Sequence, residues 1–107
     1  MLRQALRDIG IHPNLSGHRA IMQCMALLTE REGQGKPNMR DLCAEAARGR
    51  GLTGDALYKN MQYAIRTFWI RGDKEAYFRI AGCRPTTCPT VGEFLDALLD
   101  YLNPGPF

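Results

Sequence analysis

Helical periodicity constrains the fold of this chain more than any other feature of its sequence. Apolar residues recur at spacings of three and four along nearly the whole length, whereas almost no segment alternates over the length of a strand. Such a stripe is one face of an amphipathic helix, so we expect the longest one to line the core. It consists of Leu57, Met61, Ala64, Ile65, Phe68 and Trp69. Trp69 is then buried among three other members of the stripe, Leu57, Ile65 and Phe68.

Capping and turn residues divide this pattern into six helices. Ser16, Asn38 and Thr53 are the expected N-caps of three of them, and Thr90 with Glu93 predicts a capping box at the start of the last. Glycine and proline mark the turns between the helices. The expected helices span about residues 2–9, 17–32, 39–47, 53–71, 74–81 and 91–102.

The length of 107 residues fits one all-α, compact six-helix domain over residues 1–107, with no receiver domain present. A composition of 45% hydrophobic and 23% charged residues is typical of a globular domain and argues against disorder. No apolar run approaches the roughly 18 residues of a membrane helix, and the start, Met1-Leu2-Arg3-Gln4, is unlike a signal peptide. We therefore expect a cytoplasmic protein with no membrane partner.

The cysteines and histidines offer little chemistry. Cys24 and Cys43 lie in apolar helical patterns, where a free cysteine acts as a small hydrophobe. Cys83 and Cys88, separated by four residues, are the only pair that the sequence places close together, and a disulfide between them is the alternative to four reduced thiols. Neither histidine has a ligand-like spacing to a cysteine, so we expect no metal. Without a Ser/Cys–His–acid set, a Gly-rich phosphate loop or a Glu-x-x-His motif, we expect no catalytic residues, no cofactor and no enzyme activity.

Charge is distributed unevenly along the chain, although the formal net charge is only +3. Residues 36–84 hold ten Lys/Arg against five Asp/Glu, an excess of five positive charges. Residues 85–107 hold three acids and no base. A basic middle followed by an acidic end is typical of a protein that presents one face to a polyanion.

Helices 39–47 and 53–71, joined by a short glycine-containing link, have the organisation of a helix-turn-helix. In this motif the second helix lies in the major groove of double-stranded DNA, with the side opposite its apolar stripe toward the bases. That side carries Asp55, Tyr58, Lys59, Gln62 and Arg66. Lysine suits the acceptors of guanine, and glutamine pairs with the edge of adenine. The last four of these residues are therefore the candidate base contacts.

Other residues around this helix are candidate phosphate contacts, which set register and salt dependence rather than sequence preference. They are Arg48, Arg50, Thr53 and Arg71. A solvated helix face without any ligand explains the same spacing and is the alternative.

A set of residues from Ile9 to about Leu102 keeps the order and spacing of a known family. The set consists of Ile9-Gly10-Ile11, Gly17, Asp41-Leu42, Thr53, Leu57, Lys59, Ala64-Ile65, Trp69-x-Arg71-Gly72, Gly82 and Pro89-Thr90-x-x-Glu93-Phe94. It resembles the C-terminal DNA-binding effector domain of the stage-zero sporulation protein A family, the sporulation response regulators of spore-forming Firmicutes. The resemblance implies a six-helix fold, tandem dimer binding to a short repeated DNA box, transcription regulation, and contact with a sigma factor of RNA polymerase.

The chain departs from that family in the second helix of the motif. The family pattern Arg-x-Glu-Arg-x-x-Arg is matched here by Ala56, Tyr58, Lys59 and Gln62, of which only Lys59 keeps its charge. Losing a bidentate guanine contact removes about 1–3 kcal/mol of discrimination, so the DNA preference of the family is not expected here. A protein-interaction module that kept the fold and lost DNA readout is the alternative function.

The resemblance also places the sigma-factor surface at about residues 72–82, where Lys74, Glu75 and Arg79 are the candidate contacts. A receiver domain normally precedes this kind of effector domain. If Met1 is the natural start, no phosphorelay controls the chain, and its activity depends on concentration and partners.

Overall fold

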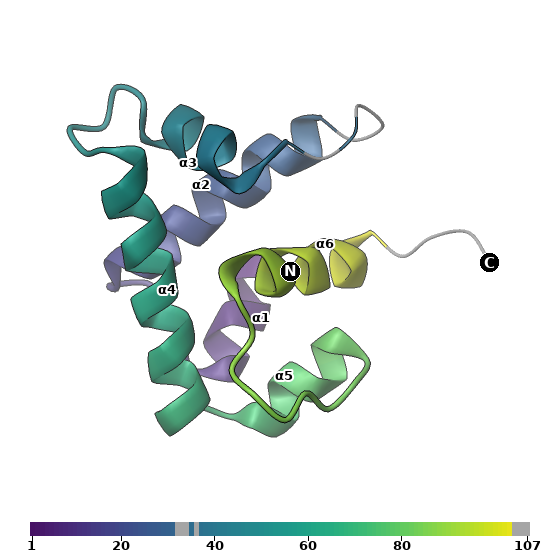
Figure 1. The fold of residues 1–107 in the computed structure, drawn as a ribbon. Coiled ribbons are helices and arrows are strands. Elements are labelled where there is room, and N and C mark those ends of the chain that lie inside the picture. The colour runs from purple at the N-terminus through teal and green to yellow at the C-terminus, as the bar shows by residue number, and fades with distance from the viewer. Residues whose placement is uncertain (32–34, 36, 104–107) are drawn as a thin grey trace.

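The computed structural model describes residues 1–31, 35 and 37–103. These residues form one all-α domain with six helices and, within the same ranges, no strand (Figure 1). The helices are α1 (Leu2–Ile9), α2 (Ser16–Glu30), α3 (Met39–Ala47), α4 (Gly54–Arg71), α5 (Lys74–Ala81) and α6 (Val91–Leu102). The all-α fold and the six helices expected from periodicity are confirmed.

The longest helix, α4, organises the molecule. In Figure 1 it runs along one edge, with α2 and α3 near its amino-terminal half and α5 following its carboxyl-terminal end. It packs on α2, α3 and α6, while α5 packs on α1 and α6. Five residues of α4 are buried: Leu57, Met61, Ala64, Ile65 and Phe68. One side of α4 therefore faces the core along its length, as its apolar stripe predicts.

The local ends of the helices mostly follow the sequence. Asn38 and Thr53 cap α3 and α4 with their side-chain oxygens, and the capping box at Thr90 is present. The expected cap at Ser16 is wrong, because Ser16 is already the first residue of α2 and Leu15 precedes it without a side-chain cap. A turn in which the Leu15 amide donates to the His12 carbonyl leads the chain into α2 one residue earlier than expected.

Trp69 is half-buried rather than buried, which corrects the expectation from the stripe. It lies about 18 Å along the axis of α4 from Leu57, since twelve residues separate the two, so one pocket cannot hold both. Its ring instead contacts Phe68 and Phe78 at centroid distances of 6.1 and 6.3 Å, and the Lys74 ammonium lies 4.6 Å from its centroid. The indole therefore closes the edge of the core beside α5.

Gly17 marks a close crossing of α2 and α4. A Cβ atom built on Gly17 would lie well under 3.0 Å from the Ala64 methyl and from the Asn60 carbonyl oxygen, both on α4. The two backbones can approach this closely only because position 17 has no side chain. This crossing sets how the start of α2 lies against α4.

Candidate nucleic-acid interface

The solvent-facing side of α4 is the longest unpartnered helix face among the described residues. Its exposed residues recur at spacings of four and three, and they are Asp55, Lys59, Tyr63, Arg66 and Ile70. We call these five residues the outer face of α4. Tyr63 and Ile70 are 69% and 78% exposed, which is unusual for large apolar side chains. The outer face thus combines two cationic residues and two large apolar ones, with one acid, Asp55, at its amino-terminal end.

The four expected base contacts do not share this face equally. Lys59 and Arg66 are exposed on it. Tyr58 and Gln62 are half-buried, and Tyr58 packs against the core and lines a hollow beside α3. Since one helical turn separates Tyr58 from Gln62, the two lie on the same flank of α4. Of the four expected base contacts, Lys59 and Arg66 therefore lie on the outer face, whereas Tyr58 and Gln62 lie at its edge.

A hollow of about 520 Å³ lies between α3 and the start of α4. We call it the α3 hollow. Its walls include Arg40, Thr53 and Tyr58, with Cys43 and Met39 on the apolar side. Arg40 was not among the residues expected to contact DNA, because its place on α3 gives no indication that it lies near Tyr58 of α4.

A second hollow, of about 340 Å³, lies on the other flank of α4, between the start of α2 and the α3–α4 link. We call it the α2 hollow. It is lined by Ser16, Arg19, Gln23, Arg50 and Asn60 among others. Arg19 was also missed in the sequence, where it stands 31 residues from Arg50 and shares no motif with it.

The four expected phosphate contacts are spread over the full length of α4. Arg48 and Arg50 are exposed on the link before the helix, and the Thr53 hydroxyl accepts a hydrogen bond of 3.1 Å from the Ala56 amide as the N-cap. Arg71 is exposed at the last residue of the helix. An 18-residue helix is about 27 Å long, so the structure does not bring Arg71 together with the others.

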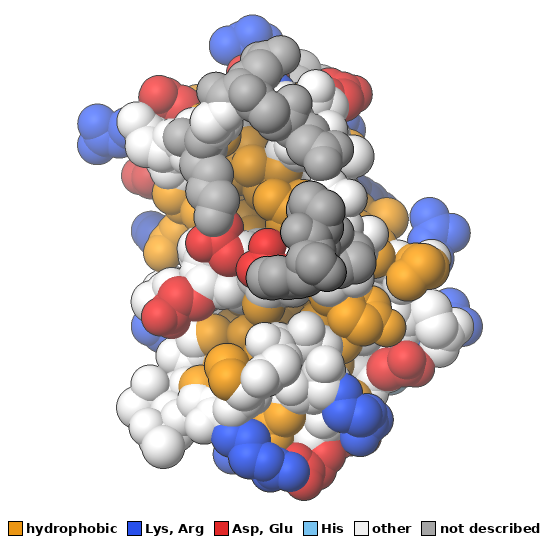
Figure 2. Space-filling view, turned by 90° about the vertical axis from the view of Figure 1, so that its right-hand side faces the viewer, with side chains coloured by type: hydrophobic (Ala, Val, Ile, Leu, Met, Phe, Trp, Pro, Cys, Tyr) orange, Lys and Arg blue, Asp and Glu red, His pale blue; other side chains and the backbone are white. Residues whose placement is uncertain are grey.

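The acidic residues of the carboxyl-terminal part lie away from the outer face of α4. They are on α6, which packs against the buried side of α4. Figure 2 shows the side of the molecule opposite the edge that α4 occupies in Figure 1. Carboxylates lie near its centre and also at its rim there, while the Lys and Arg side chains lie toward the rim.

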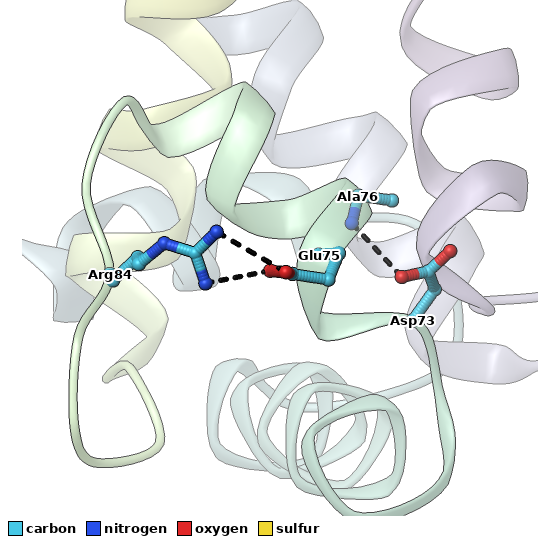
Figure 3. Close-up of polar contacts among 4 residues, drawn as sticks. All are labelled: Asp73, Glu75, Ala76 and Arg84. Carbon is cyan, nitrogen blue, oxygen red and sulfur yellow. Dashed lines mark hydrogen bonds and ion pairs between the residues drawn. The ribbon is translucent and has the colours of Figure 1, made fainter.

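The expected sigma-factor surface on α5 is partly engaged within the domain (Figure 3). Arg84 donates to both carboxylate oxygens of Glu75 at 2.9 and 3.2 Å, an exposed ion pair that the sequence did not suggest. Lys74 lies over the Trp69 ring. Arg79 is exposed and has no ion pair within the described part of the chain. Of the three expected residues, only Arg79 is left without an intramolecular contact of this kind.

The buried polar groups do not assemble a reactive centre. All four cysteines are free, and the two whose thiols contact each other are Cys24 and Cys43 rather than Cys83 and Cys88. The hydrogen bond that the Cys24 thiol donates to Cys43, together with burial, raises the pKa of Cys24, which keeps it a neutral thiol. Within residues 1–31, 35 and 37–103, no three His, Cys, Asp or Glu side chains gather as metal ligands, and no helix is both long and apolar enough to cross a membrane.

His18 is the one buried side chain of the described residues that lacks a hydrogen-bond partner at a polar atom, its Nε2. Burial, followed by the charges of Arg3 and Arg7, lowers its pKa. The neutral imidazole therefore serves as packing between α2 and α1.

Comparison of the chain with protein-family models, with curated proteins and with solved structures gave no match.

Proposed function

We propose that this chain binds double-stranded DNA as a cytoplasmic transcription regulator, with the outer face of α4 in the major groove. One observation carries the proposal: α4 exposes Lys59 and Arg66 on a face with a hollow on each flank. The α2 hollow is lined by Arg19 and Arg50, and the lining of the α3 hollow includes Arg40 as well as Asp55. A helix with its side chains is about 10–12 Å wide and the major groove is about 12 Å wide, so the phosphates of the two strands would lie beside those hollows.

In this proposal α3 and α4 act as a helix-turn-helix, and the resemblance to sporulation effector domains supplies the model for promoter binding. Lys59 and Arg66 would meet guanine acceptors, and Gln62 would reach adenine from the edge of the face. Tyr58, turned toward α3, would contact a thymine methyl or a phosphate at the groove wall. Arg79 remains the best candidate on α5 for a sigma-factor contact, because Lys74 and Glu75 have partners within the domain.

Selection from a random duplex pool, followed by sequencing, tests this function. The wild-type chain should enrich one sequence. Gln62→Ala should relax preference at one position at a cost of about 1–3 kcal/mol, and Lys59→Ala should lower both affinity and preference. Arg79→Ala removes an exposed charge from α5 and should enrich the wild-type sequence. If the Lys59→Ala/Gln62→Ala variant also enriches that sequence, α4 is not the reader.

The second candidate function is a protein-interaction module that does not read DNA. It is favoured by the exposure of Tyr63 and Ile70, because large apolar and aromatic side chains on a surface are typical of protein interfaces. The same selection distinguishes the two functions, because an interaction module would enrich no sequence and bind no duplex at low salt.

A further inference from the structure

The α2 hollow combines two arginines from different parts of the fold. Arg19 comes from the first turns of α2, and Arg50 comes from the link between α3 and α4. Figure 1 shows the start of α2 crossing α4 below that link, which is why residues far apart in the sequence share one hollow. We infer that the α2 hollow is a phosphate-binding site in which Arg19 and Arg50 hold one phosphate group.

The hollow lacks a negative charge that would neutralise these arginines. None of the residues that line it is acidic, and neither arginine belongs to the ion pairs found among the described residues. Arg48, two residues before Arg50, differs in this respect. The pKa of Glu45 is lowered by its hydrogen bond to Arg31 and also by the charge of Arg48. Of the two arginines on the link, Arg50 is the one that lines the α2 hollow.

Arg50 is held in place for this role. Its Nε donates a hydrogen bond of 2.8 Å to the carbonyl oxygen of Ala46 in the last turn of α3. This bond orients the guanidinium plane while the two terminal nitrogens remain for a ligand. A planar fork of this kind matches two oxygens of a phosphate, and less side-chain freedom is lost on binding.

The start of α2 adds neutral and dipolar donors. Leu15 provides no side-chain cap, and no acidic residue lies in the first turn, so the positive end of the helix dipole is uncompensated. Ser16, Gln23 and Asn60, whose side chains carry neutral hydrogen-bond donors, line the same hollow. With about 340 Å³, the hollow holds roughly ten water volumes, which is room for a phosphate and several waters.

Two sources could supply the phosphate: the backbone of a duplex or a free phosphate compound. The backbone source rests on the proposed function, since Asn60 borders both the hollow and Lys59 of the outer face. The phosphate site itself does not depend on DNA binding. The experiments below separate the two.

Titration with inorganic pyrophosphate, followed by amide chemical shifts of the isotope-labelled chain, tests the site alone. Shifts should concentrate at Ser16, Arg19, Arg50 and Asn60, and sodium chloride at equal ionic strength should not reproduce them. Arg19→Gln and Arg50→Gln should each weaken binding about tenfold, the usual scale for losing one charge-assisted hydrogen bond. Arg3→Gln, which removes an exposed charge from α1, is the matched control and should bind as the wild type does. Shifts spread over all basic surfaces, or unchanged in Arg19→Gln/Arg50→Gln, would overturn the site.

The salt dependence of duplex binding tests the backbone source. When the logarithm of duplex affinity is plotted against the logarithm of salt concentration, the slope is about −0.9 for each phosphate that the protein neutralises. If both arginines hold the same phosphate, each single variant should change the slope little, because the remaining arginine still neutralises that phosphate, whereas the double variant should flatten the slope by about one unit. If the double variant instead flattened the slope by about two units, the two arginines would hold two separate phosphates, and the shared site would be refuted.

The two proposals fail in distinguishable ways. A chain that binds pyrophosphate in the hollow but no duplex would refute the DNA proposal and leave the phosphate site standing. A chain that binds duplex with the same salt slope in all three arginine variants would refute the backbone contact and leave the reading helix standing.

Discussion

Replacing Gly17 by alanine should break the packing on which the interface depends. The added Cβ would meet the Ala64 methyl and the Asn60 carbonyl oxygen of α4 at well under 3.0 Å. Neither atom can move aside by a rotamer change, because one is a methyl fixed to the helix and the other is backbone. The start of α2 would have to move away from α4, which would also widen the α2 hollow.

The size of the effect follows from a matched glycine. Gly92 is the second residue of α6, as Gly17 is the second residue of α2, so the gain in helix propensity on replacement by alanine, up to about 1 kcal/mol, is common to both. A Cβ on Gly92 would meet only the Met39 methyl at 3.7 Å, an ordinary contact. Overpacking in a tight core costs about 1–3 kcal/mol or more. We expect Gly17→Ala to be less stable than Gly92→Ala by about 2 kcal/mol or more.

Thermal and urea unfolding followed by far-UV circular dichroism measures this difference. Gly92→Ala should unfold at or above the wild-type temperature, and Gly17→Ala should unfold about 8–16 °C below Gly92→Ala if the two differ by about 2 kcal/mol. The urea m-value should be unchanged, since the same surface is exposed on unfolding. Equal stability of the two variants would show that α2 and α4 do not cross at Gly17, and the α2 hollow would then lose its geometric basis.

Two further predictions concern His18 and the cap of α6. Burial, and then the charges of two arginines on α1, holds the pKa of His18 below the usual 6.5 that it regains on unfolding. The unfolded chain therefore binds the proton more readily, and stability should fall as the pH falls through about 6.5. Urea unfolding at pH values on either side should show a smaller fall for His18→Gln, while the exposed His12→Gln should behave as the wild type; equal falls in all three would refute the argument. Thr90→Ala removes the hydroxyl that accepts from the Glu93 amide and should cost about 1 kcal/mol, whereas Thr90→Ser should restore the cap; a Thr90→Ala variant with wild-type thermal stability would contradict this expectation.

The residues of α4 show which positions helical spacing can predict and which it cannot. Spacing correctly placed five of the six stripe residues in the core, because the angle of a residue around a helix depends only on its position along it. Spacing was wrong for Tyr58, expected on the outer side, and for Trp69, expected in the core, because both lie at the flanks of the helix and are half-buried. Which neighbour covers such a flank depends on α3 for Tyr58 and on α5 for Trp69.

Local interactions account for what the sequence by itself determined about this protein. The six helices and the caps at Asn38, Thr53 and Thr90 all depend on residues within one or two turns of each other, so they can be recognised without knowing the fold. The one wrong cap, Ser16, lies where α2 crosses α4 and the turn before it decides where the helix starts.

Only the tertiary structure decided which distant residues share a surface. Arg19 joins Arg50 in one hollow, and Cys24 meets Cys43 in the core, because helices pack along directions set by their whole contact area rather than by nearby residues. The same packing left Tyr63 and Ile70 in solvent beside Lys59. Periodicity defines the faces of each helix, but the helices packed against a face determine whether it remains open to a partner.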